Sequence, residues 1–392
     1  MQVSTILHEL LSSSIHKTRL KSLIPIITSV IKSKKLQLSK LGRQLGGKTK
    51  ERSGIRIVDR LLRNEFYQSQ SLIVYRSICN RVLKNNENPS IIVDWSSIPN
   101  SQHHCDNKEQ CILRAVLPSI GRGITLYEEV HPKSKENNPK IHHSFLKNLN
   151  LVLPPQSKPC LITDAGFKNP WFKAVSNMGW DYVGRVRGIT QYDGGNGFYA
   201  IKTLFAQATG KARYIGFLAV AKTNVLFHHI VLYKGVSKGR HKMTKTKKRD
   251  QRNDSKKHSA SWKEPWVLVT SLEEVKDNPD IARIKYKQRM TIEENFRDTK
   301  STQFGFSFDK NITKKPKRYI VWLMLAALAS LVAWLTGATA EKLKLHFDFQ
   351  ANSYKHRRVL SFFYLGCQII RKKIKFDIDW GLISKEQNIC SF

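Results

Sequence analysis

The sequence predicts an α/β protein in which a mixed α/β domain follows an all-helical N-terminal region and is itself interrupted by a mostly β insertion. Apolar residues recur at helical spacing through residues 1–85. Short apolar runs typical of strands then alternate with helical segments over 86–186, and the domain resumes at 284–345. Strand patterns around a polar stretch mark the insertion, 187–283, and residues 346–392 form a C-terminal helical region.

The N-terminal region contains two short helices, and the second is basic. Ser39 is a suitable N-cap for a helix that contains Leu41 and Leu45 and stops at Gly46-Gly47. The next helix carries apolar residues and interleaved arginines, namely Ile55, Val58, Leu61 and Leu62 with Arg52, Arg56, Arg60 and Arg63. A helix, a glycine turn and a basic helix resemble a helix-turn-helix DNA reader, so we expect these arginines to contact DNA. A plain helical bundle remains the alternative.

The elements of the α/β domain follow a defined order. Three strands come first, then a helix, a strand, a second helix and a fifth strand. The strands are expected at 90–95, 111–118, 123–130, 159–164 and 180–186, and the helices around 145–149 and 170–178. This is the order of a ribonuclease-H-like domain.

The insertion adds strand patterns at 212–221, 225–233 and 265–270. Between the last two lies a basic stretch, 238–257, with ten Lys or Arg residues against two acids. We interpret it as a flexible loop that lies along a phosphate backbone. A solvated loop without a ligand is the alternative.

Composition indicates a polyanionic partner. The formal net charge is +37, from 67 Lys and Arg against 30 Asp and Glu. Such an excess disfavours a compact state through self-repulsion unless a polyanion binds. Nucleic acid is the first candidate and an anionic membrane surface the second.

The cysteines indicate a reducing compartment. The six cysteines include no CxxC pair, which favours reduced thiols of a cytoplasmic protein. A zinc site at His103, His104, Cys105 and Cys111 lacks a second ligand pair at finger-like spacing. The N-terminus has no basic region followed by an apolar stretch, so no secretory signal is expected.

One segment is long enough to span a membrane. Residues 319–340 run 22 residues without a charge. The stretch is single, and its end contains small and polar residues. A helix buried in the core of a large domain is equally apolar on all sides, and this is the interpretation we favour. A membrane-associated basic protein anchored through this segment remains the alternative.

Three acids are candidate metal ligands. Asp94 and Asp164 each end a predicted strand, and Glu293 lies on a predicted helix. If 286–300 is one helix, Tyr286, Arg289, Arg297 and Lys300 share a stripe of roughly 80° with Glu293. Cations around a single acid suit a metal ligand with phosphate-binding neighbours, although a basic solvated face is also possible. Three carboxylates can hold two Mg²⁺ ions about 3.5–4 Å apart, and Mn²⁺ can substitute.

These motifs resemble those of a known family. VDW with Asp94, TDAGF with Asp164, and Y-x2-R-x3-E-x6-K at 286–300 are similar to the three motifs of the bacterial DDE transposases of the IS-four family, the third being its YREK signature. Within that family the branch of transposon Tn-ten is the most similar. The likeness extends over nearly the whole chain, through 121–129, 179–188, 263–270 and 349–361.

The resemblance implies cut-and-paste transposition of an insertion sequence through a hairpin intermediate. It makes Asp94, Asp164 and Glu293 both catalytic residues and metal ligands. It implies that Tyr286, Arg289 and Lys300 bind the DNA phosphates near the cut at the element end. Arg297 lies on the same predicted helix face. Trp266 occupies the motif position of a tryptophan that stacks on a flipped base, although an ordinary place in a strand core is the alternative.

The implied partners are double-stranded DNA, as terminal inverted repeats and target, and a second copy in a homodimeric synaptic complex. No membrane and no small-molecule substrate are expected, and the protein would act in the bacterial cytoplasm at the nucleoid. A DNA-binding repressor without catalysis is a second possibility, against which the intact acids and YREK spacing argue.

Overall fold

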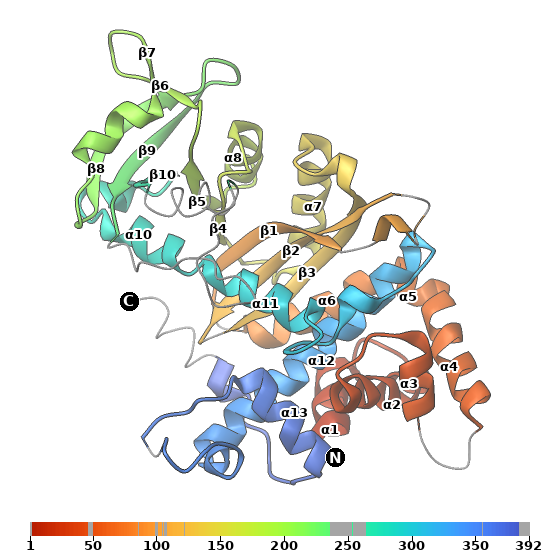
Figure 1. Cartoon of the computed structure of the whole chain (residues 1–392). Coiled ribbons are helices and arrows are strands. Elements are labelled where there is room, and N and C mark those ends of the chain that lie inside the picture. The colour runs from red at the N-terminus through yellow and green to blue at the C-terminus, as the bar shows by residue number, and fades with distance from the viewer. Residues whose placement is uncertain are drawn as a thin grey trace. The chain divides into compact units, whose positions relative to one another are not determined.

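The computed structural model describes residues 2–45, 50–84, 86–98, 101–103, 105, 108–120, 122–235, 253, 264–354 and 356–383. The chain divides into two compact units. The first consists of Met1–Pro159 and Gln288–Phe392, and the second of Cys160–Lys287. Figure 1 traces the elements in chain order. The mixed α/β class predicted from the sequence is confirmed. The predicted basic loop, 238–257, lies outside the described residues apart from position 253.

The first unit begins with helices, as predicted. They are α1 (Gln2–Leu11), α2 (Lys17–Ser33), α3 (Leu38–Gln44), α4 (Glu51–Arg63), α5 (Glu65–Ser69) and α6 (Ser71–Val82). The expected cap at Ser39 is wrong: α3 starts two residues earlier than this cap implies, with Gln37 at the N-cap and no side-chain capping bond. Helices α3 and α4 cross closely at two glycines. A Cβ atom on Gly54 would overlap the carbonyl oxygen of Gly42.

We expect Gly54→Ala to destabilise the α3–α4 pair, although alanine favours a helix by up to about 1 kcal/mol over glycine. The added methyl group meets backbone rather than a movable side chain, and overpacking of this kind costs about 1–3 kcal/mol. The measurement is the thermal unfolding midpoint, with Ser53→Ala on the exposed side of the same helix as the control. A raised midpoint for Gly54→Ala would show that the helices separate without cost.

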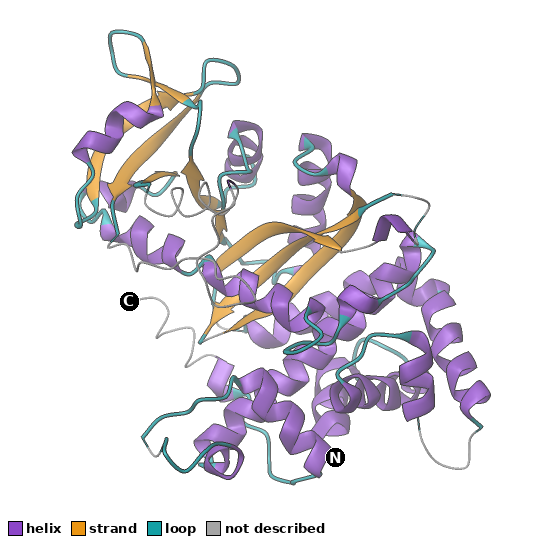
Figure 2. Cartoon of the chain, viewed as in Figure 1, coloured by secondary structure: helices purple, strands orange, loops and turns teal. Residues whose placement is uncertain are grey.

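Three antiparallel strands form the sheet of the first unit (Figure 2). They are β1 (Ser90–Ile98), β2 (Gln110–Ser119) and β3 (Arg122–Pro132). Asp94 pairs with Arg114 on β2, and Arg114 pairs with Glu128 on β3. Because cross-strand partners share a face, these three charged residues lie in one row. The prediction that Asp94 ends its strand is wrong, since β1 continues to Ile98 and Asp94 lies in its middle.

Alternation along β1 separates two environments. Trp95, the neighbour of Asp94, points to the opposite face of the sheet. There its indole nitrogen donates to Nε2 of His142 at 3.1 Å, from α7 (Pro139–Val152). The face of Asp94 is covered instead by α11 (Met290–Lys300), which contacts all three strands. Each face of this sheet therefore has its own helix.

The long apolar segment forms α12 (Pro316–Lys342) of the first unit. This helix is long and apolar enough to cross a membrane, but 89% of its most apolar window is buried inside the protein. It packs on α13 (Phe362–Lys372), and Gly337 and Gly366 are in contact with the facing backbone. The burial fits the predicted core helix.

The predicted continuous helix over 286–300 is wrong. One helix, α10, ends at Lys287, and α11 begins at Met290, with a turn at Gln288 and Arg289 between them. Tyr286 therefore belongs to the second unit, while Arg289, Glu293, Arg297 and Lys300 belong to the first. A helical projection through all five positions does not describe their arrangement.

The second unit is a sheet with short helices. The strands are β4 (Cys160–Thr163), β5 (Asp181–Val186), β6 (Gln191–Asp193), β7 (Phe198–Ala200), β8 (Arg213–Val220), β9 (Leu226–Tyr233) and β10 (Trp266–Thr270). Their order is β4-β5-β10-β9-β8-β6-β7, with β4 and β5 parallel and the other pairs antiparallel. The helices are α8 (Asn169–Ser176) and α10 (Asp280–Lys287). The predicted strands at 212–221, 225–233 and 265–270 are confirmed as β8, β9 and β10.

Candidate active site

Two of the three predicted acids converge on one arginine in the first unit. Nη2 of Arg289 donates to Oε1 of Glu293 at 2.7 Å, and Nη1 donates to Oδ2 of Asp94 at 3.3 Å. The other oxygen of Asp94 accepts the backbone N–H of Trp95 at 2.8 Å. Asp94 is mostly buried, whereas the side chain of Glu293 is 48% exposed. A strand residue and a helix residue thus present carboxylates to the same cation.

A buried network fixes α11 on the sheet beneath these acids. The guanidinium of Arg114 is buried and pairs with Glu128 at 2.5 Å. Its Nη1 also donates to Oδ1 of Asn295 at 2.6 Å and to Oγ1 of Thr299 at 3.1 Å. The amide of Asn295 donates in turn to the backbone oxygen of Gly123 at 2.7 Å. A buried charge is costly unless it is paired, so this network strongly favours one position of the helix that carries Glu293.

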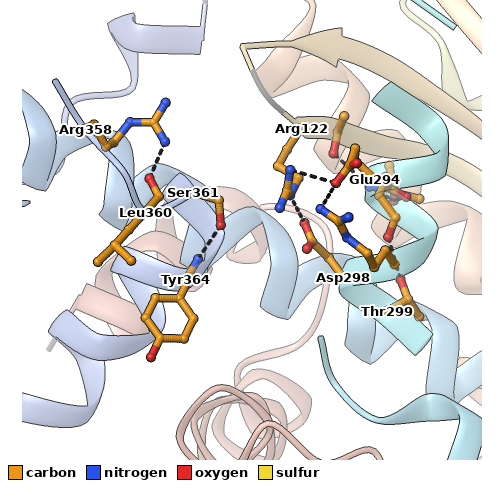
Figure 3. Close-up of polar contacts among 12 residues, drawn as sticks. Arg122, Glu294, Asp298, Thr299, Arg358, Leu360, Ser361 and Tyr364 are labelled. Carbon is orange, nitrogen blue, oxygen red and sulfur yellow. Dashed lines mark hydrogen bonds and ion pairs between the residues drawn. The ribbon is translucent and has the colours of Figure 1, made fainter. Parts of the chain in front are cut away.

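A second set of ion pairs joins α11 to the start of β3. Arg122 points toward Glu294 and Asp298 on the helix (Figure 3). Its Nη1 lies 3.1 Å from Oε2 of Glu294, and its Nε lies 2.7 Å from Oδ2 of Asp298. Burial raises the pKa of Asp298 to about 7, against the opposing effect of Arg122. Arg297 pairs with Glu294 rather than with Glu293, and its guanidinium lies 5.7 Å from the centre of the Phe304 ring. Arg297 is therefore turned away from the acid it was predicted to accompany.

Lys300 lies at the other end of α11 and points back to β1. Its ammonium group donates to Oγ of Ser96 at 2.5 Å and to the backbone oxygen of Ser97 at 3.1 Å. Burial lowers the pKa of Lys300 to about 8, and Arg114 adds to this effect while Asp94 opposes it. Lys300 therefore loses its charge in a range where ordinary lysines keep it.

The remaining predicted residues of the centre lie in the second unit. Asp164 was predicted to end its strand and lies one residue beyond the end of β4, and its Oδ1 accepts the backbone N–H of Gly166 at 2.7 Å. Trp266 opens β10 and is half-buried. Its ring lies edge-on to that of Tyr286 at 4.9 Å and 5.5 Å from that of Tyr233. Tyr286 is buried, and its ring packs against that of Trp266 inside the second unit.

The four arginines predicted to contact DNA all lie on α4 and are exposed. They are Arg52, Arg56, Arg60 and Arg63. Arg63 pairs with Asp59 at 2.9 Å, and Asp59 also accepts from Arg318 at 2.7 Å. Their spacing of four, four and three residues forms one stripe on the helix, opposite buried Val58, Leu61 and Leu62.

The donors suit a hard cation. Asp94 and Glu293 offer carboxylate oxygens around a point that already holds the positive charge of Arg289. Mg²⁺ usually takes one or two protein carboxylates together with water and substrate phosphate, so this pair fits it. Among the described residues no group of three or more His, Cys, Asp or Glu side chains is placed to hold a metal ion, and His104 of the zinc candidates lies outside these residues.

Sequence reasoning missed Arg114, Glu128 and Asn295. A signal for the first was present, because Arg114 interrupts an otherwise apolar strand, CILRAVLP. A charged residue in such a run requires a buried partner. The partner's identity depends on strand register and on where α11 packs, and neither can be derived from a local pattern.

A scan against protein families identifies the chain. The model described as the transposase DDE domain matches residues 86–332. No curated protein matches the chain. The matched segment covers more than half of the sequence and contains Asp94, Asp164 and Glu293. DNA is thus the partner implied for the chain, and a divalent metal its cofactor. The chain belongs to the DDE transposases, metal-dependent enzymes that cleave DNA and transfer its strands.

Proposed function

We propose that the chain is the cut-and-paste transposase of an insertion sequence, of the IS-four kind. It binds the terminal inverted repeats as a homodimer, cleaves at the element ends through a hairpin and joins the 3′ ends to target DNA. Its catalytic domain is ribonuclease-H-like, and α1–α6 form the DNA-binding domain. The observation that carries the proposal is the convergence of Asp94 and Glu293, from separate motifs, on Arg289 of the YREK pattern.

The catalytic residues in this proposal are Asp94, Asp164 and Glu293. These residues would hold Mg²⁺, which would supply activation of the attacking oxygen and stabilisation of the leaving oxygen of the phosphodiester. Every strand-breaking and joining step is an in-line attack of an oxygen on phosphorus, so one centre serves them all. The backbone N–H of Trp95 donates to Asp94 and fixes the orientation of its carboxyl group.

The cations around the acids hold the DNA. Arg289 and Lys300 flank Glu293 on α11 and its N-terminal turn, where they can bind phosphates on either side of the cut. Arg297 is exposed and adds to the same surface. Tyr286 supports Trp266, and Trp266 offers a half-buried aromatic ring for an unstacked base.

The direct test is cleavage of DNA that carries the element's own ends. Inverted repeats are sought in the DNA on either side of the gene, and a duplex ending in them is incubated with the purified chain and Mg²⁺. We expect a nick at the element boundary, followed by a hairpin product. Binding of the repeat without any cleavage would favour a repressor instead.

End recognition is expected to depend on the exposed stripe of α4. Changing Arg52, Arg56 and Arg60 together to glutamine should reduce affinity for the terminal repeat and lower the salt dependence by about one unit of slope for each phosphate that the variant no longer binds. The measurement is the dissociation constant over a range of salt concentrations. As a control, the three lysines Lys314, Lys315 and Lys317 are changed to glutamine, which removes equal charge elsewhere. Equal loss of specific affinity in both variants would argue against α4.

DNA affinity is expected to fall as pH rises through 8. The pKa of Lys300 is lowered to about 8, so it is charged below this pH and neutral above it, and only the charged form attracts phosphate. Between pH 7 and 9 the charged fraction of Lys300 falls about tenfold, and the affinity for DNA should fall by up to the same factor. Lys300→Arg keeps its charge over this range and should flatten the curve. A wild-type affinity that stays constant would exclude Lys300 from the phosphate contacts.

A further inference from the structure

We propose that Arg289 is an internal counter-ion that holds Asp94 and Glu293 together in the free protein and yields them to metal only when DNA binds. This inference rests on the proposed metal site. It assigns Arg289 a positioning role that precedes any contact with phosphate, and it couples metal occupancy to the presence of DNA.

The geometry supports a bridge rather than a chance surface pair. Arg289 uses different nitrogens for the two acids, Nη1 for Asp94 and Nη2 for Glu293, so one planar group spans both. The side chains of Arg289 and Asp94 are only 18% and 15% exposed, so this half of the bridge is shielded from solvent, while Glu293 at 48% exposed forms its outer half. Arg289 also occupies the N-cap position of α11, where the chain turns between two helices. Its backbone is thereby fixed next to the helix that carries Glu293.

The bridge and a metal ion compete for the same oxygen atoms. Arg289 engages Oδ2 of Asp94 and Oε1 of Glu293, while Oδ1 of Asp94 is held by the backbone of Trp95. A divalent ion bound to those oxygens would lie beside a guanidinium of like charge, which disfavours its binding. The free protein should therefore bind metal weakly although both carboxylates are correctly placed.

DNA resolves the competition because phosphate also binds arginine. Guanidinium groups pair with phosphate through two parallel hydrogen bonds, as they do with carboxylate. A phosphate at the site draws Arg289 from the acids, adds an oxygen ligand and cancels positive charge. By linkage, DNA then increases metal affinity, and metal increases DNA affinity by the same factor. Cleavage chemistry is assembled only when a substrate is present.

Arg297 provides a matched control for this role. It lies on the same helix, four residues after Glu293 as Arg289 lies four before it. It pairs with Glu294, not with Glu293. Removal of Arg297 therefore deletes the same charge at a similar distance along the chain without opening the bridge.

The experiment measures Mn²⁺ binding to the full chain without DNA, from the electron paramagnetic resonance signal of free Mn²⁺. Variants are Arg289→Gln, Arg289→Lys, Arg297→Gln and Glu293→Gln. We expect Arg289→Gln to bind Mn²⁺ about 5- to 150-fold more tightly than wild type, the usual range of such couplings. Arg289→Lys introduces a point charge that cannot span both acids, so its Mn²⁺ affinity should lie between those of wild type and Arg289→Gln. Arg297→Gln should have nearly the Mn²⁺ affinity of wild type. A duplex carrying the element end, corrected for its own Mn²⁺ binding, should tighten binding to wild type more than to Arg289→Gln, because the variant gains the phosphate ligand but has no bridge to release.

The outcomes separate this inference from the metal site itself. Equal Mn²⁺ affinity in wild type and both Arg289 variants, with binding lost in Glu293→Gln, overturns the counter-ion role and leaves the site in place. If Arg289→Gln and Arg297→Gln raised the Mn²⁺ affinity equally, the cause would be the loss of one positive charge rather than the bridge. This result would also overturn the counter-ion role. Binding that Glu293→Gln leaves unchanged would refute the metal site and the inference together. Circular dichroism melting of each variant confirms that a folded protein is compared.

Discussion

Asp94→Ala, Asp164→Ala and Glu293→Ala are each expected to abolish strand cleavage while leaving affinity for the terminal repeat within a few-fold of wild type. Charge stabilisation by bound metal is worth several kcal/mol, so the loss should be at least about a thousandfold at 1.36 kcal/mol per factor of ten. Binding, measured without divalent metal, survives because no cation is removed and the arginines of α4 lie away from these acids. Cleavage and binding are measured on the same labelled duplex.

Glu294→Gln is the matched control for Glu293→Ala. The two acids are adjacent on α11, but Glu294 pairs with Arg122 and Arg297 rather than with Arg289. We expect this variant to keep most of its cleavage activity. If Glu294→Gln were as inactive as Glu293→Ala, the helix as a whole rather than one carboxylate would be at fault. A cleaving Asp94→Ala variant would remove that residue from the centre.

Trp266→Ala is expected to slow hairpin formation more than first-strand nicking. Nicking acts on a nearly regular duplex, whereas hairpin closure folds the strand back and leaves a base unstacked. Loss of an aromatic platform worth roughly 1–3 kcal/mol would slow closure about 5- to 150-fold. Nicked intermediate should therefore accumulate on a gel that separates it from hairpin ends. Trp266→Phe, which keeps an aromatic face, should restore much of the rate.

The structure also defines the competing explanation for Trp266. Its ring packs against Tyr233 and Tyr286 at 5.5 and 4.9 Å, so its removal opens a gap in the second unit. Tyr233→Leu disturbs the same cluster without removing the proposed platform. If both variants slow nicking and closure equally and lower the unfolding midpoint, Trp266 is a core residue. A delay confined to closure in Trp266→Ala supports the platform.

The sequence was most informative where local periodicity determines structure. Strands such as β8, β9 and β10 were predicted within one or two residues, since alternating and continuous apolar runs reflect burial directly. The buried character of α12 followed from its apolar residues on all sides. Asp94 was correctly placed on this strand, but the end of the strand was predicted too early. The apolar run stops at Asp94, whereas β1 continues for four more residues.

The arrangement around Glu293 was less predictable. Tyr286 lies seven positions before Glu293, which is a good helical spacing, yet the chain turns at Gln288 and Arg289 without a proline or glycine to signal it. Arg289 reaches Asp94 only because α11 lies across the face of β1. Arg297 forms its pair with Glu294 because Arg122 of β3 draws that acid to the same side. These contacts depend on tertiary packing, which helical projection does not contain.

Metal rescue of a cysteine variant tests most directly whether these acids hold the catalytic metal. Mg²⁺ prefers oxygen ligands and binds thiolate poorly, whereas Mn²⁺ accepts sulfur more readily. Asp94→Cys and Glu293→Cys are assayed for cleavage of the element end with each ion in turn. The account predicts no detectable cleavage with Mg²⁺ and recovered cleavage with Mn²⁺. Cleavage by the cysteine variants at wild-type rate with Mg²⁺ would contradict it, because the carboxylates would then not be metal ligands.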